Sequence, residues 1–299
     1  MDPAPPDVGR YGIWTFQLDQ VPSAEAAASV GELEDLGFGC VWVPEAVGRE
    51  AFTSASLLLR GGHEIVVATG VAQIWARAPS SAAAAHKTLT EAYPDRFVLG
   101  LGVSHQPMVE GLLGMDYSRP YSAMVDYLDA MDGAVFVAAP PTAEPRRVLA
   151  ALGPRMLALA GERAAGALTY FVPPAHTASA RAALGADALL AVEQAVVLET
   201  DPDRAREVAR THTRIYTGLP NYANNLRRVD PTLTDADFAD GGSDRLVDLV
   251  VAWGDVDTVC ARIAAHHDAG ADHVCIQVID GTAAVPQTAW HDLAAALDL

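Results

Sequence analysis

Short apolar segments alternate with alanine-rich segments of helical periodicity along the whole chain, and this alternation constrains the fold more than any other feature. Eight apolar segments are predicted strands: 11–16, 40–43, 65–70, 97–101, 148–152, 167–172, 189–198 and 274–279. The predicted helices include 24–36, 79–92, 121–137, 153–165, 202–217 and 256–269. Repeated βα units imply a parallel sheet, and continuously apolar strands imply a sheet covered on both faces.

Eight such units in roughly 250 residues are the number found in a (β/α)8 TIM barrel. We therefore predict one α/β barrel domain over residues 1–299, with a doubly wound open sheet as the alternative. Residues 218–243 are rich in Asn, Asp, Pro and Gly and interrupt the seventh βα unit, before helical periodicity returns at 246–253. We interpret 218–243 as an insertion, or lid, that covers a site, with a surface excursion or an oligomer contact as the alternative.

Composition narrows the function classes. Hydrophobic residues make up 51% of the chain, and no segment reaches the roughly 20 apolar residues of a membrane span. Residues 1–9 do not resemble a secretory signal, and Cys40, Cys260 and Cys275 are predicted to be reduced thiols, so we expect a cytoplasmic protein. A net charge of −18 argues against nucleic-acid binding. The expected partner is a small-molecule substrate, with neither nucleic acid nor membrane.

The end of the fourth predicted strand is the most informative local motif. Gly100 and Gly102 allow a close approach of the backbone, and Ser104 and His105 follow directly. The spacing resembles the Gly-x-Gly-x-x-Gly dinucleotide fingerprint, but His105 occupies the third glycine position and no phosphate-binding helix starts there. The motif therefore presents side chains at a strand end, where a barrel has its active site. A tight turn with a solvated histidine is the plainer interpretation.

Among the early strand ends, Glu45 and His105 are the two groups suited to proton transfer. Pairing of Glu45 with Arg49 is the structural alternative. The sequence Gly153-Pro154-Arg155 is typical of a helix N-terminus and predicts a phosphate site, or else an ordinary helix start with a solvated arginine. No metal-ligand spacing and no Gly-x-Ser-x-Gly elbow is present, so we predict neither a metal nor a serine nucleophile.

Six segments in order resemble one family over nearly the whole chain. They are 36–45, 68–71, 96–102, 153–156, 160–167 and 269–274. Together they resemble the bacterial-luciferase-like superfamily, in particular its branch of oxidoreductases from actinobacteria that depend on the deazaflavin coenzyme F420. The resemblance implies a (β/α)8 barrel with a flavin or deazaflavin across the strand ends, a phosphate site near the fifth and sixth units, a non-prolyl cis peptide at Gly70-Val71, and a homodimer.

Carried over to this chain, the resemblance assigns acid/base roles to His105 and Glu45. The residues it places around the cofactor are Gly70, Val71, Ala72, Gly102, Ser104, Gly153, Pro154, Arg155 and Tyr170. Two positions depart from the family pattern: Ala46 stands where many deazaflavin enzymes have a histidine, and His105 stands where some relatives have a glutamate. His105 is therefore the best single catalytic candidate.

The predicted function is hydride transfer between F420 and an organic substrate. The first alternative is an FMN-dependent monooxygenase supplied by a separate flavin reductase, and the second is a non-catalytic flavin-binding barrel, which the missing histidine at position 46 keeps open. Exposed arginines near the cofactor would favour F420 with its polyglutamyl tail, and Arg77, Arg119 and Arg155 are the candidates. The aromatic residues near the strand ends line either a site or the core: Trp14, Phe16, Trp42, Trp75 and Tyr170.

Overall fold

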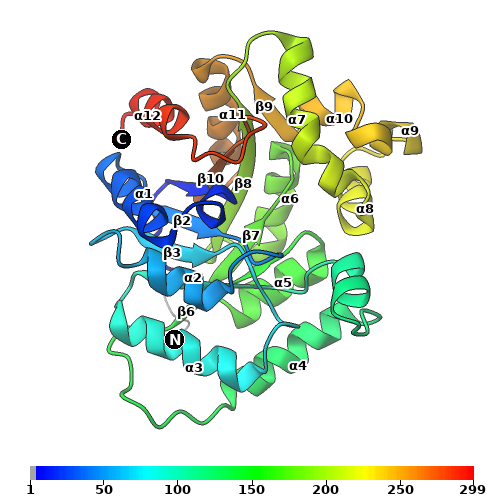
Figure 1. Cartoon of the computed structure of the whole chain (residues 1–299). Helices are drawn as coiled ribbons and strands as arrows, with labels where there is room; N and C mark the ends of the chain where they lie inside the picture. Colours follow the sequence, from blue (N-terminus) through cyan, green and yellow to red (C-terminus); the bar gives the residue numbers. More distant parts are fainter. Residues whose placement is uncertain (1–4) are drawn as a thin grey trace.

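A closed parallel barrel forms the centre of the computed structural model, which describes residues 5–299 (Figure 1). Its strands are β1 (Tyr11–Trp14), β2 (Cys40–Val43), β3 (Val66–Thr69), β5 (Phe97–Gly102), β6 (Arg146–Ala150), β7 (Gly166–Thr169), β8 (Leu189–Val197) and β10 (His273–Val278). Parallel pairing of β10 with both β1 and β8 closes the sheet. The predicted (β/α)8 barrel is confirmed, and the open sheet is excluded.

Helices cover the outside of the barrel (Figure 1). They are α1 (Ser23–Asp35), α2 (Ala51–Leu58), α3 (Pro79–Ala92), α4 (Pro120–Asp132), α5 (Pro154–Arg163), α6 (Pro174–Leu184), α7 (Pro202–Thr217), α8 (Pro220–Val229), α9 (Asp235–Phe238), α10 (Asp244–Val250), α11 (Val256–Asp268) and α12 (Gln287–Ala296). Shorter helical segments are η1 (Gln17–Asp19), η2 (Pro107–Leu112) and η3 (Ala239–Gly241). Proline at the start of α3, α5 and α7 fixes the first helical turn where its missing N–H costs no hydrogen bond.

Strand β8 is longer than its neighbours, and two strands share one of its edges. Its first half pairs with β7 through Val192, and its last residues pair on that same edge with β9 (Val251–Trp253) from Ala195 onward. The prediction of a helix over 246–253 was therefore wrong at its end, because α10 stops at Val250 and the chain continues as β9. The segment 218–243 contains α8, α9 and η3, and Tyr222 of α8 packs against Phe171, which follows β7, with ring centroids 5.4 Å apart.

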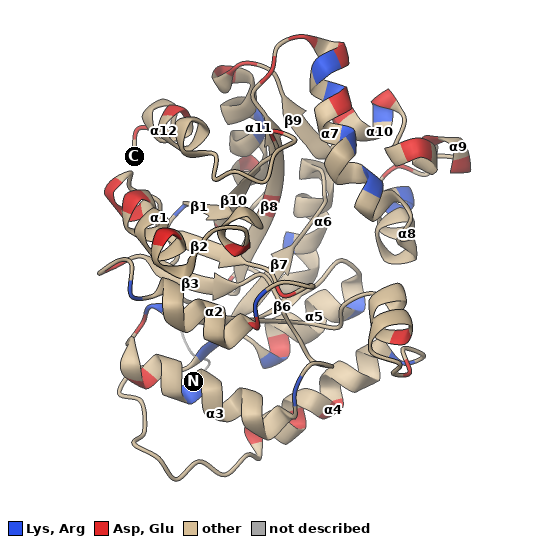
Figure 2. Cartoon of the chain, viewed as in Figure 1, with Lys and Arg blue, Asp and Glu red and all other residues tan. Residues whose placement is uncertain are grey.

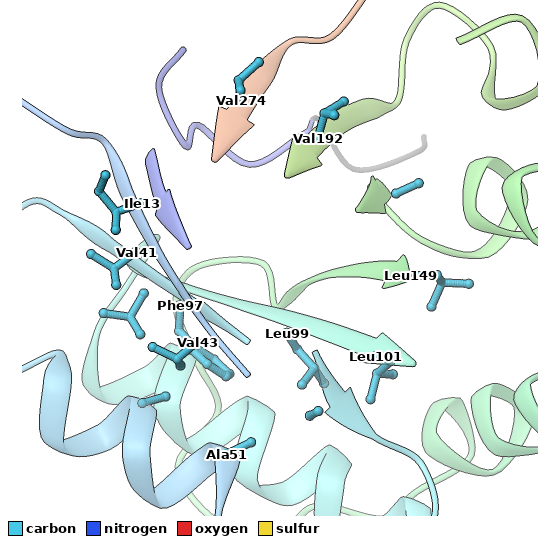
Figure 3. Close-up of a cluster of buried hydrophobic side chains, with 14 of the residues drawn as sticks. Ile13, Val41, Val43, Ala51, Phe97, Leu99, Leu101, Leu149, Val192 and Val274 are labelled. Atoms are coloured by element: carbon cyan, nitrogen blue, oxygen red, sulfur yellow. The ribbon is translucent and has the colours of Figure 1, made fainter. Parts of the chain in front are cut away.

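Side chains alternate between the interior of the barrel and the layer beneath the helices, as strand geometry requires. Outward-facing residues such as Ile13, Val41, Leu99 and Val274 pack against the helices, with Ala51 of α2 among them (Figure 3). A smaller cluster that includes Trp14, Trp42 and Val148 fills the interior. Most charged residues lie on the helices and loops, whereas the strands are largely apolar (Figure 2).

Trp42 belongs to the core and not to the site. Its indole N–H donates to His273 Nε2 at 2.9 Å, and the other ring nitrogen of His273 bonds to the carbonyl of Gly9 at 2.8 Å. The three cysteines are free, and Cys40 and Cys275 are buried in their strands. Within residues 5–299, no helix has both the length and the apolar character that crossing a bilayer would require.

Candidate active site

The backbone at Gly70 and Val71 connects β3 to the short strand β4 (Ala72–Gln73) at the carboxyl ends of the strands. Together with Gly102 of β5, we call these residues the seat. The peptide bond Gly70-Val71 is cis, as the resemblance implied. The indole of Trp14 donates to the Gly70 carbonyl at 3.0 Å. A Cβ added at Gly102 would lie 2.5 Å from Val71 Cγ2, so glycine is what lets Val71 lie against β5. Ala72 is buried and pairs with Leu101.

The start of α5 lies at the end of β6. Its Met156 and Leu157 N–H groups donate to the Gly153 carbonyl at 3.1 and 3.0 Å, so the first turn offers the Arg155 N–H and the positive end of the helix dipole. Gly153 is the N-cap and Pro154 follows it, as predicted from the sequence. A Cβ added at Gly153 would meet no atom within 4 Å, so the space in front of this terminus is open. The guanidinium of Arg155 is exposed and stacks over the Tyr121 ring at 4.2 Å. This terminus is chemically suited to an anion.

Glu45 is engaged in a different ion pair from the one the sequence suggested. Its partner is Arg77, which also bonds to Glu50 at 2.8 Å, whereas Arg49 donates to the carbonyls of Leu18 and Val21. The Glu45 carboxylate also accepts the Gln73 N–H at 2.8 Å and the Ala51 N–H at 3.2 Å. Arg77, with 12% of its side chain exposed, is therefore not one of the exposed arginines that a polyglutamyl tail would need.

The loop after β5 places Ser104 and His105 at the same end of the barrel. Ser104 has a left-handed backbone (φ 56°), and its carbonyl accepts the Tyr117 hydroxyl at 2.8 Å. Nδ1 of His105 is buried and has no partner among residues 5–299. Burial lowers the pKa of His105, against a smaller opposite effect of a hydrogen bond with Asn221. The imidazole is therefore neutral near pH 7 and has one nitrogen available.

A continuous series of rings connects His105 with the end of β1. We call the five residues Trp14, Tyr170, Tyr216, Tyr222 and His105 the aromatic belt. Successive ring centroids along it are 5.0, 5.2, 5.3 and 5.4 Å apart. Tyr222 and Asn221 belong to the segment 218–243, so the predicted insertion does contact the catalytic candidate.

A buried acid lies at the point where β7 and β8 separate. Glu193 faces the barrel interior, and its Oε2 accepts the Phe171 N–H at 3.0 Å, which has lost its strand partner there. Its Oε1 has no partner within residues 5–299. Burial raises the pKa of Glu193 to about 8, against a smaller lowering by the Phe171 hydrogen bond, so this carboxyl is protonated at neutral pH.

The structure thus brings most of the predicted site residues to one end of the barrel. Glu45 follows β2, and the positions at or just after the ends of β3 and β5 are Gly70, Val71, Ala72, Gly102, Ser104 and His105. The remaining predicted positions follow β6 and β7: Gly153, Pro154, Arg155 and Tyr170. Sequence reasoning assigned no site role to Tyr216 or Tyr222. The Asn-Tyr pair after Pro220 was the available signal for Tyr222, whereas nothing in helix α7 distinguishes Tyr216 from a core residue.

A cavity of about 730 Å³ opens at the opposite end of the barrel. It lies where β6, β7 and β8 begin, and its lining includes Lys87, Arg146, Glu162 and Asp187. Parallel barrels build their active sites at the carboxyl ends of the strands, and the unpaired His105 nitrogen and the Gly70-Val71 seat are there. We therefore place the site at that end. Across residues 5–299, no group of three or more His, Cys, Asp or Glu residues could hold a metal ion.

Comparison with known proteins identifies the family. The luciferase-like monooxygenase family model matches residues 11–273, so the chain belongs to this family of oxidoreductases. A Mycobacterium tuberculosis protein, provisionally named as a coenzyme F420-dependent oxidoreductase, is 30% identical over 195 residues. That match spans 55% of this chain and 55% of the relative, so the chain spans about half the length of the curated relative it matches.

Solved structures share the fold at low sequence identity. An F420-dependent secondary alcohol dehydrogenase bound to an F420-acetone adduct has a TM-score of 0.75 at 15% identity, over 95% of this chain and 96% of that one. The coenzyme F420-dependent tetrahydromethanopterin reductase of Methanopyrus kandleri has a TM-score of 0.74 at 18% identity, over 96% and 97%. An FMN-bound diketocamphane monooxygenase component from Pseudomonas putida has a TM-score of 0.66 at 15% identity, over 96% of each chain.

Proposed function

We propose that the protein is a coenzyme F420-dependent oxidoreductase that exchanges a hydride between the deazaflavin and an organic substrate. The observation that carries the proposal is the seat of Gly70, Val71 and Gly102, with the open N-terminus of α5 at the end of the next strand. The names of the mycobacterial relative and of two structural neighbours favour F420.

The residues present fit a flat ring carrying a phosphorylated chain. Val71 would support the ring, because the missing side chain at Gly102 leaves it against β5. The Arg155 N–H, the helix dipole and the guanidinium of Arg155 would hold the phosphate, since nothing occupies the space within 4 Å of the Gly153 Cβ position. When bound, the deazaflavin would supply the hydride chemistry, and the protein would orient the reactants and handle the proton.

We assign the proton-handling role to His105. Its neutral imidazole offers Nδ1 to a substrate oxygen, and Asn221 and Tyr222 hold the ring from the side of α8. A neutral imidazole donates or accepts one proton according to its tautomer. Glu45 remains the second acid/base candidate by its place after β2. Because Arg77 and two backbone N–H groups engage its oxygens, we propose that it positions the β3–β4 segment.

An FMN-dependent monooxygenase supplied by a separate reductase is the second candidate function. The observation that favours it is the FMN-bound structural neighbour, which shares the fold at a TM-score of 0.66. Arg77 is also not exposed, which removes one of the three arginines that a polyglutamyl tail was expected to use. A non-catalytic flavin-binding barrel would share the seat but would lack turnover.

The test is a titration of the purified protein with F420 and, separately, with FMN, following fluorescence quenching at fixed salt. We expect binding of F420 in preference to FMN. Substitution of His105→Ala is expected to abolish reduction or oxidation of F420 by substrate while leaving the affinity for F420 within about threefold. His291→Ala, on the exposed face of α12, is the matched control and should change neither. Preference for FMN would move the protein to the monooxygenase class, and binding of neither would exclude both proposals.

A further inference from the structure

The aromatic belt crosses the end of the barrel from β1 to the loop after β5. Its rings come from five separate elements or loops, and each centroid lies within 5.4 Å of the next. Phe16 extends the belt beyond Trp14 at 4.7 Å. Phe16, Tyr170 and His105 keep part of their surface exposed, whereas Trp14, Tyr216 and Tyr222 are buried behind them. The exposed surface of the belt is therefore aromatic.

The hydroxyl groups of Tyr170 and Tyr216 are both hydrogen-bonded. The Tyr170 hydroxyl lies 2.9 Å from the Tyr216 hydroxyl and donates to Gln277 Oε1 at 2.7 Å. These bonds fix the ring of Tyr170 in place. At the far end of the belt, Nδ1 of His105 is buried without a partner among the described residues. The belt thus combines several ring surfaces with one free hydrogen-bonding nitrogen.

None of the five belt residues carries a permanent positive charge. Burial keeps His105 neutral, and Arg77 is neutralised by Glu45 and Glu50. Lys87 is the only lysine of the chain, and it lines the cavity at the opposite end of the barrel. Arg155, the exposed arginine at the start of α5, is assigned above to the cofactor phosphate. A phosphate, sulfonate or carboxylate over the belt would therefore lose hydration without gaining a counter-charge from the belt residues, and that loss is costly.

We propose, building on the proposed function, that the substrate is an uncharged aromatic compound whose hydroxyl or carbonyl oxygen bonds to His105 Nδ1 while its rings pack on the belt. Ring packing supplies most of the affinity, because offset and edge-to-face aromatic contacts add to the burial of apolar area. The single polar contact at His105 fixes which end of the substrate faces the proton-handling group. The ring surfaces, the single polar contact and the absence of positive charge on the belt together select against sugar phosphates and small carboxylates.

The test compares two probes that share a ring system and differ in charge: β-naphthol and its sulfonated analogue, hydroxynaphthalene sulfonate. Isothermal titration calorimetry is run on the full chain, first alone and then with saturating F420. We expect β-naphthol to bind at least tenfold more tightly than the sulfonate in one or both states. Phe16→Leu keeps apolar volume but removes a partly exposed ring, and it should weaken β-naphthol binding about five- to tenfold. Tyr11→Ala, at the other end of β1, is the matched control and should not.

Two results overturn the proposal. One is binding of the sulfonate as tight as that of β-naphthol or tighter, and the other is absence of β-naphthol binding both with and without F420. Should Phe16→Leu fail to fold, His105→Phe retains a ring and removes Nδ1, and it is expected to lower β-naphthol affinity at least threefold. Binding of β-naphthol by a protein that does not bind F420 would refute the proposed function and support the substrate class.

Discussion

Replacement of Glu193 by glutamine is predicted to stabilise the protein progressively as the pH rises from 5 to 8. The carboxyl is 1% exposed and accepts one hydrogen bond, from the Phe171 N–H, which the amide oxygen of glutamine would keep. Burial raises the pKa of Glu193 from an ordinary 4.5 to about 8. The folded state therefore binds a proton that the unfolded state has released over this range, so the stability of the wild type contains a contribution that falls as the pH rises.

The size of the effect follows from that pKa difference. Each pH unit between 4.5 and 8 changes the contribution of Glu193 by about 1.4 kcal/mol, which gives a ceiling of roughly 5 kcal/mol above pH 8. Urea unfolding of both proteins at half-unit pH steps measures the difference, and subtraction removes the other titrating groups. Glu207→Gln, an exposed change on α7, is the control. A stability difference between Glu193→Gln and the wild type that is independent of pH would refute the assignment of a protonated buried acid.

Three further predictions concern charge and packing. Burial lowers the pKa of His86, His212 and His266 to about 3 and of His273 to about 4. The contribution of these four histidines to stability should therefore be complete above pH 6.5 and decrease as the pH falls towards 4. Proton uptake on unfolding is measurable by calorimetry in buffers of different ionisation enthalpy, and no uptake near pH 5 would contradict this. Arg77→Met leaves the Glu45 carboxylate, whose side chain is 6% exposed, without its ion pair. It should cost about 3–5 kcal/mol in urea unfolding, and a loss below 1 kcal/mol would show that the pair is not needed. Gly102→Ala places a Cβ 2.5 Å from Val71 Cγ2 and is expected to weaken F420 binding at least tenfold, whereas Gly111→Ala, whose Cβ meets nothing within 4 Å, should not; equal affinities would contradict the proposed seat.

The barrel was predictable because two sequence features indicate its strands. Most are short, mainly apolar segments, and most are followed by a periodic segment long enough to cover them, as with 97–101 and 121–137. Strand β9 was not predictable in this way. Its three residues directly follow α10, and their strand pairing depends on the exposed edge that β8 leaves after β7 has ended.

The site was predictable only as far as strand order determines it. Residues that follow parallel strands meet at one end of a barrel, so the sequence predicted that His105, Gly153 and Tyr170 share one end, and they do. The partners of those residues were not. Arg77 rather than Arg49 pairs with Glu45 because the segment after β4 turns back over β2, and Tyr222 reaches His105 only through the placement of α8. Such contacts depend on loop geometry that composition and periodicity do not encode.

The location of the cofactor is the central claim, and a crystal structure of the protein grown with F420 tests it most directly. We predict electron density for the ring against Val71 and for the phosphate at the N-terminus of α5, beside Gly153 and Arg155. Density in the cavity lined by Lys87 and Arg146 at the opposite end of the barrel, or a fully occupied ligand that contacts neither Val71 nor α5, would contradict the account.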